Sequence, residues 1–219
     1  MHNTIQNLIN IENEIKSNLS DLNNINLPKI IAVTKTFKID KILPLINYGH
    51  VDFGENKIQE AVDKWTEIKF KNSNIKLHMI GKLQTNKVKF AVKLFDYIHS
   101  VDNKKLAQKI ADEQKKVSKL IKIFIQVNIG DEEQKSGIKK TEVSELISYC
   151  KKINLNVVGL MCLPPADDNS SSYFNEMNLL NKSFGLSELS MGMSSDYIDA
   201  TKNSSTYLRI GSSIFGKRI

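Results

Sequence analysis

The sequence predicts a single α/β domain, a (β/α)8 TIM-type barrel with one extra N-terminal helix. Short apolar segments, typical of buried strands, alternate with amphipathic helical segments roughly eight times along the chain. This alternation favours a parallel sheet, and its repetition within 219 residues favours a closed barrel. No glycine-rich dinucleotide-binding motif follows the first strand, which argues against a Rossmann fold. We therefore expect residues 1–219 to form one barrel domain.

The first half of the chain predicts the extra helix and four strands. Apolar residues recur at helical spacing over residues 3–22, and residues 23–28 form a loop. Asp40 is expected to cap the next helix, and Gly49 to end it. We expect strands at 30–33, 51–53, 77–80 and 97–101, and helices at 40–49, 58–68, 86–94 and 104–116.

The second half continues the same pattern to the end of the chain. Strands are expected at 121–129, 155–161, 186–191 and 207–210, and the first of these is expected to be the longest. Helices are expected at 141–150, 170–180 and 196–201, with Thr141 as a cap. Residues 167–172 are the most loop-like insertion.

Composition is that of an ordinary globular protein, with 41% hydrophobic and 25% charged residues. We expect neither a signal peptide nor a membrane segment, and two cysteines without metal-site spacing favour a reducing cytoplasm. The net charge of +7 comes from scattered lysines without interleaved aromatic residues, which argues against nucleic-acid binding.

Lys35 is the first candidate functional residue, because it follows the first predicted strand. Active sites of barrel enzymes lie at the C-terminal ends of the strands. A lysine that is partly desolvated there can lose its proton near neutral pH and attack a carbonyl carbon. The alternative is that Lys35 is one of many lysines and simply reaches solvent.

The two C-terminal segments, residues 190–196 and 204–216, are rich in serine and glycine. Barrel enzymes often bind phosphate with the loops after strands seven and eight. Hydroxyl groups, glycine N–H groups and a helix start are suited to a dianion. The alternative is a serine-rich helix cap and turn without a ligand, which local sequence alone predicts equally well.

Arg209 lies inside the last predicted strand of a chain that otherwise uses lysine. A buried arginine requires a partner or a ligand, and its planar group offers a fixed set of donors. Asn56, His78 and His99 also lie in or after strands, where such residues are more often satisfied polar core residues. No catalytic carboxylate pair, metal-ligand cluster or Ser–His–Asp arrangement is evident.

Several stretches together resemble the pyridoxal phosphate homeostasis proteins, which are related to the N-terminal barrel of alanine racemase. The resemblance covers nearly the whole chain in the right order. It rests on Ile31-Ala32-Val33-Thr34-Lys35, Phe53-Gly54-Glu55-Asn56, residues 78–87, Lys135-Ser136-Gly137, Gly159-Leu160-Met161 and the two C-terminal segments.

The resemblance implies a barrel that holds pyridoxal 5′-phosphate (PLP). Lys35 matches the lysine that forms a Schiff base with the cofactor, and Arg209 matches the arginine facing the pyridine nitrogen. Phosphate-side positions match Ser194, Ser205, Thr206, Gly211 and Ser212, while Asn56, His78 and Met193 match other residues lining the site. The family usually has glycine where this chain has Ser204, so a positive φ there would strain the loop.

We therefore expect PLP binding and a part in intracellular PLP (vitamin B6) homeostasis, without robust catalysis. Arginine can only donate to an unprotonated pyridine nitrogen, which weakens the cofactor as an electron sink. The chain also has no room for the second domain that racemases of this kind use. A racemase-type PLP enzyme and a cofactor-free Schiff-base aldolase are the alternatives. Beyond PLP, the partners considered are PLP-dependent apo-enzymes, and we expect a monomer.

Overall fold

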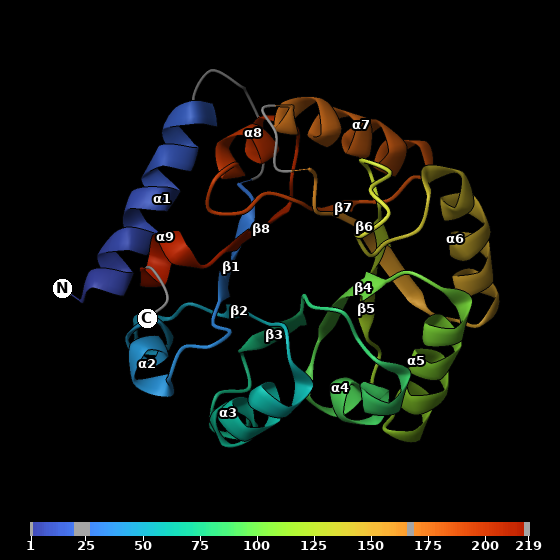
Figure 1. The fold of residues 1–219 in the computed structure, drawn as a ribbon. Coiled ribbons are helices and arrows are strands. Elements are labelled where there is room, and N and C mark those ends of the chain that lie inside the picture. Colours follow the sequence, from blue (N-terminus) through green and yellow to red (C-terminus); the bar gives the residue numbers. More distant parts are fainter. Residues whose placement is uncertain (1, 20–26, 166–168, 217–219) are drawn as a thin grey trace.

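The computed structural model describes residues 2–19, 27–165 and 169–216, and it confirms the barrel. Eight parallel strands follow one another around the ring in sequence order, and β1 pairs with both β2 and β8 to close it (Figure 1). The strands are β1 Lys29–Val33, β2 Asp52–Glu55, β3 Lys76–Met79, β4 Tyr97–Val101, β5 Lys122–Val127, β6 Asn156–Cys162, β7 Glu188–Ser190 and β8 Tyr207–Ile210.

Helices surround the strands as an outer layer (Figure 1). The extra N-terminal helix α1 packs against α2, α8 and α9, so it covers the seam between the first and last strands. The helices are α1 Asn3–Leu19, α2 Ile39–Tyr48, α3 Ile58–Lys71, α4 Val88–Leu94, α5 Lys104–Lys116, α6 Val143–Lys152, α7 Ser170–Ser183, α8 Tyr197–Lys202 and α9 Ser212–Phe215, with short 3-10 turns η1 Thr85–Lys87 and η2 Lys140–Glu142.

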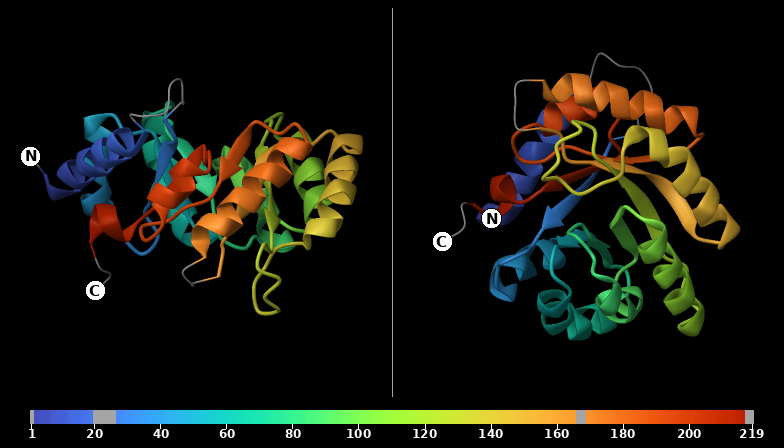
Figure 2. Two further views of the ribbon diagram at one scale, coloured as in Figure 1. Left: turned by 90° about the horizontal axis from the view of Figure 1, so that it is seen from above. Right: turned by 45° about the vertical axis from the view of Figure 1, so that its right-hand side comes forward.

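All strands point the same way, so the barrel has two distinct ends. At the C-terminal mouth the strands finish, and the loop of residues 128–139 projects from this end (Figure 2, left). At the N-terminal mouth the strands begin. Function in barrels of this kind is built at the C-terminal mouth, because the loops there can vary without disturbing the strand layer.

The core has two parts, one on each side of the strand layer. The larger part lies between strands and helices; there Trp65 is fully buried, packs on Phe53 at 4.9 Å and donates its indole N–H to Glu55. The smaller part lies inside the barrel and consists of Ile31, Tyr97, Phe124, Met161 and Tyr207. Polar side chains from alternate strand positions share that interior.

Several predicted boundaries and caps differ from the structure. β5 ends at Val127, so the seven-residue β6 is longer than the strand predicted to be longest. Asp40 is not a cap, because α2 begins after Lys38, and Thr141 lies inside η2. Residues 170–172 belong to α7 rather than to a loop, and α9 was not anticipated.

The remaining predictions concern the end of α2, residues outside the described ranges, and the absence of a membrane segment. Gly49 ends α2 with φ +97°, as predicted. Residues 20–26 and 167–168, parts of the predicted first helix, loop and insertion, lie outside the described residues. Within the described ranges, none of the helices has the length and apolar character needed to cross a bilayer.

Candidate functional site

A cavity of about 500 Å³ opens at the C-terminal mouth of the barrel. It brings together most of the residues that the sequence singled out, although they come from strand ends far apart in the chain. They are Lys35, Asn56, Met193, Ser194, Arg209, Gly211 and Ser212. The remaining wall is Val33, Ile80, Gly81, Leu163 and Ser195.

Lys35 lies in the turn after β1, and helix α3 holds the residues on either side of it. The Lys64 ammonium donates to the carbonyl oxygen of Thr34 at 2.9 Å, and the backbone N–H of Thr36 donates to Glu60 Oε1 at 2.6 Å. Thr36 has φ +69°, an uncommon conformation for a β-branched residue. These contacts hold the backbone from which half-buried Lys35 reaches the cavity.

The charges behind this turn are paired with one another. The Lys64 ammonium contacts Glu55 Oε1 at 2.9 Å and Glu60 Oε1 at 3.0 Å. Burial raises the pKa of Glu60, but hydrogen bonds from Lys64 and from the Thr36 N–H outweigh it and leave the pKa below its usual value. Glu60 therefore stays ionised at neutral pH and can keep accepting from Thr36 and Lys64.

Elsewhere in the same cavity wall, the loops after β7 and β8 converge on one hydroxyl group. The backbone N–H groups of Gly211 and Ser213 donate to Ser194 Oγ at 3.4 and 3.3 Å. These bonds are long, so both N–H groups remain available to a stronger acceptor. Two backbone donors with the Ser194 and Ser212 hydroxyls form an anion cradle, the name used below for these four residues.

The shape of the loop after β7 depends on a glycine. Gly192 has φ +89°, and a Cβ there would lie 2.5 Å from the Cβ of Ala200 in α8. The following turn is closed by Asp196, whose Oδ1 accepts from the backbone N–H of Met193 at 2.5 Å. Strand end, glycine and turn together place Met193 and Ser194 in the cavity wall.

Arg209 forms the floor of the cavity from inside the barrel. It is 5% exposed and donates from Nη1 to Ser190 Oγ and from Nη2 to the carbonyl oxygen of Cys162, both at 2.7 Å. Burial lowers the pKa of Arg209 from its ordinary value. An arginine pKa starts high enough that the group remains a cation and a pure donor.

Asn56 presents the clearest unmet hydrogen-bonding demand in the cavity wall. Its side-chain oxygen is buried and has no partner among the described residues. Its position depends on Gly81, where a Cβ would lie 2.4 Å from the carbonyl oxygen of Asn56. An orphaned polar atom in a cavity wall fits a bound polar ligand, because such atoms are costly when unpaired.

Three predicted site residues do not line this cavity. His78 is fully buried inside the barrel between Asp52 and His99. Ser205 and Thr206 precede β8 and therefore lie at the opposite, N-terminal mouth. There the Ser205 hydroxyl lies 2.8 Å from the Met191 carbonyl oxygen, and Thr206 Oγ1 accepts from the Leu189 N–H at 2.7 Å.

The departure at Ser204 has a conformational consequence. Ser204 has φ +67°, the left-handed region that glycine adopts without strain. It lies with Ser205 and Thr206 at the N-terminal mouth, so the strain does not reach the anion cradle. The expected backbone strain is therefore present. It should affect the free energy of unfolding rather than the shape of the cavity.

Sequence reasoning missed several residues that complete the site. Ser213 supplies a cradle N–H, and Ser190 accepts from Arg209. Strand periodicity was the available signal for Ser190, since inward-facing positions of a strand recur every second residue. Loop residues such as Ser195 follow no such period.

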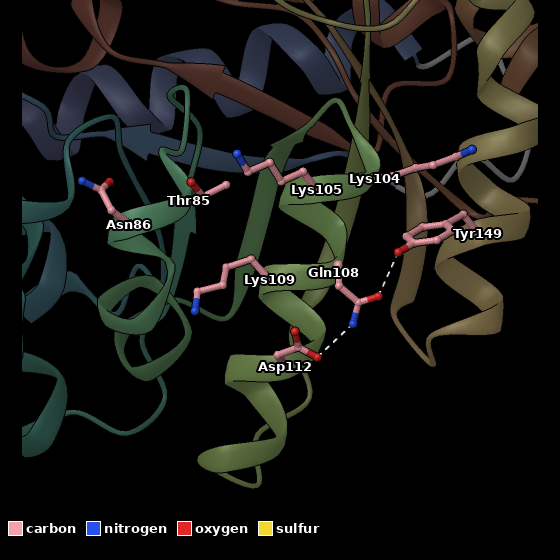
Figure 3. A pocket seen from close by; sticks show the side chains of 8 residues that line it. All are labelled: Thr85, Asn86, Lys104, Lys105, Gln108, Lys109, Asp112 and Tyr149. Carbon is pink, nitrogen blue, oxygen red and sulfur yellow. Dashed lines mark hydrogen bonds between the residues drawn. The ribbon is translucent and has the colours of Figure 1, made fainter.

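A second hollow of about 560 Å³ lies on the outer wall between η1, α5 and α6 (Figure 3). It is larger than the cavity at the mouth, but several of its polar groups are already paired with protein groups. Gln108 accepts from the Tyr149 hydroxyl at 2.8 Å and donates to Asp112 at 2.9 Å. Lys109 is paired with Glu113. We assign the functional site to the mouth, where donors converge and an acceptor is unmet.

The fold and site define a ligand-binding barrel with a lysine and an anion cradle at its C-terminal mouth. The chain belongs to the family described as alanine racemase, N-terminal domain, whose model matches residues 11–218.

Relatives of similar length carry one name. The pyridoxal phosphate homeostasis protein of Pasteurella multocida is 35% identical over 201 residues, which is 87% of this chain and 86% of that protein. The protein of the same name from Escherichia coli is 33% identical over 199 residues, covering 86% and 85%.

Solved structures agree with the barrel. PipY of Synechococcus elongatus, solved with PLP bound, is 28% identical with a TM-score of 0.81, and the match covers 92% of this chain and all of that one. An alanine racemase of Clostridium difficile shares the fold at 17% identity and a TM-score of 0.72. That match covers 99% of this chain but 57% of the racemase.

Proposed function

We propose that this protein binds PLP and takes part in PLP homeostasis. The observation that carries the proposal is that Lys35, the Arg209 cation and three residues of the anion cradle line one cavity. An aldehyde, a phosphate and a ring nitrogen in one small molecule match these three features. The names of the relatives and the PLP-bound PipY structure support the same cofactor.

Each residue of the cavity has a distinct part in the proposal. Lys35 forms the Schiff base with the aldehyde, and the anion cradle holds the phosphate through backbone N–H and hydroxyl donors. Arg209 donates to the ring nitrogen, and Asn56 supplies its unpaired oxygen to a donor of the ligand. PLP itself supplies an electrophilic carbon and, in enzymes, an electron sink.

The same residues support a binding role without robust catalysis. Arg209 is a donor that keeps its protons, so it leaves the ring nitrogen unprotonated and the ring a poor sink for electrons. We propose that residues 1–219 act as one PLP-binding barrel domain and that the protein is a monomer. We also propose that PLP-dependent apo-enzymes receive the cofactor from it. Two free, buried cysteines support a reducing, cytoplasmic setting.

Absorbance spectroscopy tests the cofactor directly. Protein loaded with PLP should show a visible band, and borohydride should trap the adduct on Lys35. Lys35→Ala should lose both signals. Lys29→Ala is the matched control, because Lys29 lies at the other end of the same strand and donates to Tyr207. A colourless wild-type protein without a trapped adduct would contradict PLP binding.

Two further assays separate homeostasis from catalysis. PLP-loaded protein mixed with an apo-enzyme should restore activity at a rate different from that of free PLP at the same concentration. Identical recovery with free PLP would argue against delivery. Exchange of the α-proton of L-alanine in deuterated water, well above the rate with free PLP, would instead favour the racemase-type alternative.

A further inference from the structure

A continuous chain of hydrogen bonds crosses the barrel interior from the cavity floor to the opposite mouth. Arg209 Nη1 lies 2.7 Å from Ser190 Oγ, which lies 2.9 Å from His99 Nδ1. His99 Nε2 lies 3.0 Å from His78 Nδ1, and His78 Nε2 lies 2.9 Å from Asp52 Oδ1. We call Ser190, His99, His78 and Asp52 the relay.

The relay has one direction of donation. Asp52 as a carboxylate can only accept, so His78 carries its proton on Nε2 and accepts at Nδ1. His99 then donates from Nε2 and accepts at Nδ1, which leaves Ser190 to donate its hydroxyl proton to His99. Arg209 can only donate, and Ser190 Oγ is free to accept from it. The direction of donation deduced from Asp52 therefore agrees, at Ser190, with the direction deduced from Arg209.

Both histidines are held neutral in this order. Burial lowers the pKa of His78 against the opposing effect of Asp52, and burial with the neighbouring His78 and Arg209 lowers the pKa of His99. Lys29 also acts to lower the pKa of His78, whereas Asp96 acts to raise it. Neutral rings are required, because a doubly protonated His99 would offer Ser190 a donor instead of an acceptor.

Aromatic rings restrict the relay to this geometry. The ring of Tyr97 stacks on His78 with centroids 4.3 Å apart and planes at 10°. Phe124 stacks on His99 at the same centroid distance, with planes at 23°. His78 and His99 are fully buried, so neither ring can turn to solvent for another partner.

The relay ends at a third hollow, which lies at the N-terminal mouth. Asp52 lines a cavity of about 250 Å³ together with Glu12, Lys16, Lys29 and His50. The relay therefore connects a carboxylate that lines the hollow at one mouth to the Arg209 cation, which lines the cavity at the other. Among the described residues no carboxylate is within ion-pair distance of Arg209, so its charge is compensated by oriented acceptors, the Ser190 hydroxyl oxygen at the end of the relay and the Cys162 carbonyl oxygen.

We propose that Ser190, His99, His78 and Asp52 are positioning residues, which orient Arg209 and thereby set the hydrogen bond that it makes to the ring nitrogen of PLP. This inference rests on the proposed function. The Ser190 hydroxyl accepts from Nη1 and the Cys162 carbonyl accepts from Nη2, so both terminal nitrogens of a guanidinium that lines the cavity are held in place. The relay residues act through Arg209 and do not line the cavity themselves.

The test compares PLP with an analogue whose ring nitrogen is replaced by C–H. Ser190→Ala should weaken binding of PLP about tenfold, because hydrogen bonds to charged groups are worth that much, and should change binding of the analogue less than about threefold. The ¹⁵N chemical shift of ring-labelled PLP should also move. Thr201→Val is the control, since Thr201 is a buried hydroxyl residue that donates to the Tyr197 carbonyl within α8, outside the relay and the cavity wall.

Asp52→Asn provides a second variant in case Ser190→Ala does not fold, because it keeps the shape and changes the far end of the relay. It should move the ¹⁵N shift in the same direction by a smaller amount. Equal losses for PLP and the analogue, with an unmoved ¹⁵N shift, would overturn the relay while leaving PLP binding intact. A wild-type protein that binds neither ligand would overturn the proposed function as well.

Discussion

The two mouths of the barrel use the same side-chain types in different ways. At the C-terminal mouth, Ser194 Oγ receives two long backbone hydrogen bonds beside an open cavity. At the N-terminal mouth, Ser205 Oγ lies within 3.3 Å of the carbonyl oxygens of Leu189, Met191 and Tyr207. A hydroxyl group surrounded by strand carbonyls is committed to the fold, whereas one facing a cavity can bind a ligand.

The lysines at the two ends of β1 differ in the same way. Lys35 reaches the cavity, but Lys29 donates to the Tyr207 hydroxyl at 3.3 Å. The Tyr207 and Tyr97 hydroxyls lie 3.2 Å apart inside the barrel, and burial, with the neighbouring Tyr97, raises the pKa of Tyr207. Lys29 is thus bonded to a tyrosine pair inside the barrel, whereas Lys35 lines the cavity at the other mouth.

Two buried histidines in the barrel interior should make the free energy of unfolding depend on pH. His78 and His99 have lowered pKa values in the folded state, so below about pH 6.5 the unfolded chain binds protons that the native protein does not. Stability is therefore lost as the pH falls. We expect a loss of about 2 kcal/mol between pH 7.5 and 5.5, measured by urea unfolding.

His99→Gln is the control for this pH dependence, because glutamine does not titrate. Its stability should fall less over the same interval. Lowered carboxyl pKa values, as at Glu60, act at lower pH, since unfolded Asp and Glu titrate near about pH 4. A flat profile from pH 7.5 to 5.5 in the wild-type protein would contradict the neutral relay.

A crossed pair of substitutions tests the contrast between the mouths. Ser194→Ala should weaken PLP binding about tenfold and change the free energy of unfolding by less than about 0.5 kcal/mol. Ser205→Ala should lower the free energy of unfolding by about 1 kcal/mol and leave PLP affinity within about threefold. Titration with PLP and urea unfolding of both variants give the four values. Loss of PLP affinity in Ser205→Ala would show that Ser205 contributes to PLP binding after all.

The smallest expected effect is a gain in stability at Ser204. Ser204→Gly removes the strain of a left-handed serine and should raise the free energy of unfolding by up to about 1 kcal/mol. Because the residue lies at the N-terminal mouth, PLP affinity should stay the same. Ser204→Ala, which keeps the Cβ, is the control and should give no gain; destabilisation by glycine would show that the serine hydroxyl matters more than φ.

Local pattern was sufficient for the elements of the fold and for one half of the site. Period-two apolar runs and helical spacing are properties of short segments, so strands and helices could be placed without tertiary information. Helix starts were harder to predict: Asp40 and Thr141 have the chemistry of caps, yet the N-cap residues of α2 and η2 are Lys38 and Lys139, two positions earlier. Lys35 and Arg209 were singled out by their positions in or just after predicted strands, whereas Ser194 was identified individually only through the family resemblance.

The sequence by itself determined the alternation that makes a barrel and the residues near the ends of its strands. Only the tertiary structure decided which mouth each hydroxyl serves, because Ser205 and Ser212 are seven positions apart yet lie at opposite ends of β8. It also decided that His78 belongs to the interior relay, since the partners Asp52 and His99 come from other strands. Hydrogen-bond partners across a closed barrel depend on strand register and closure, which no local pattern specifies.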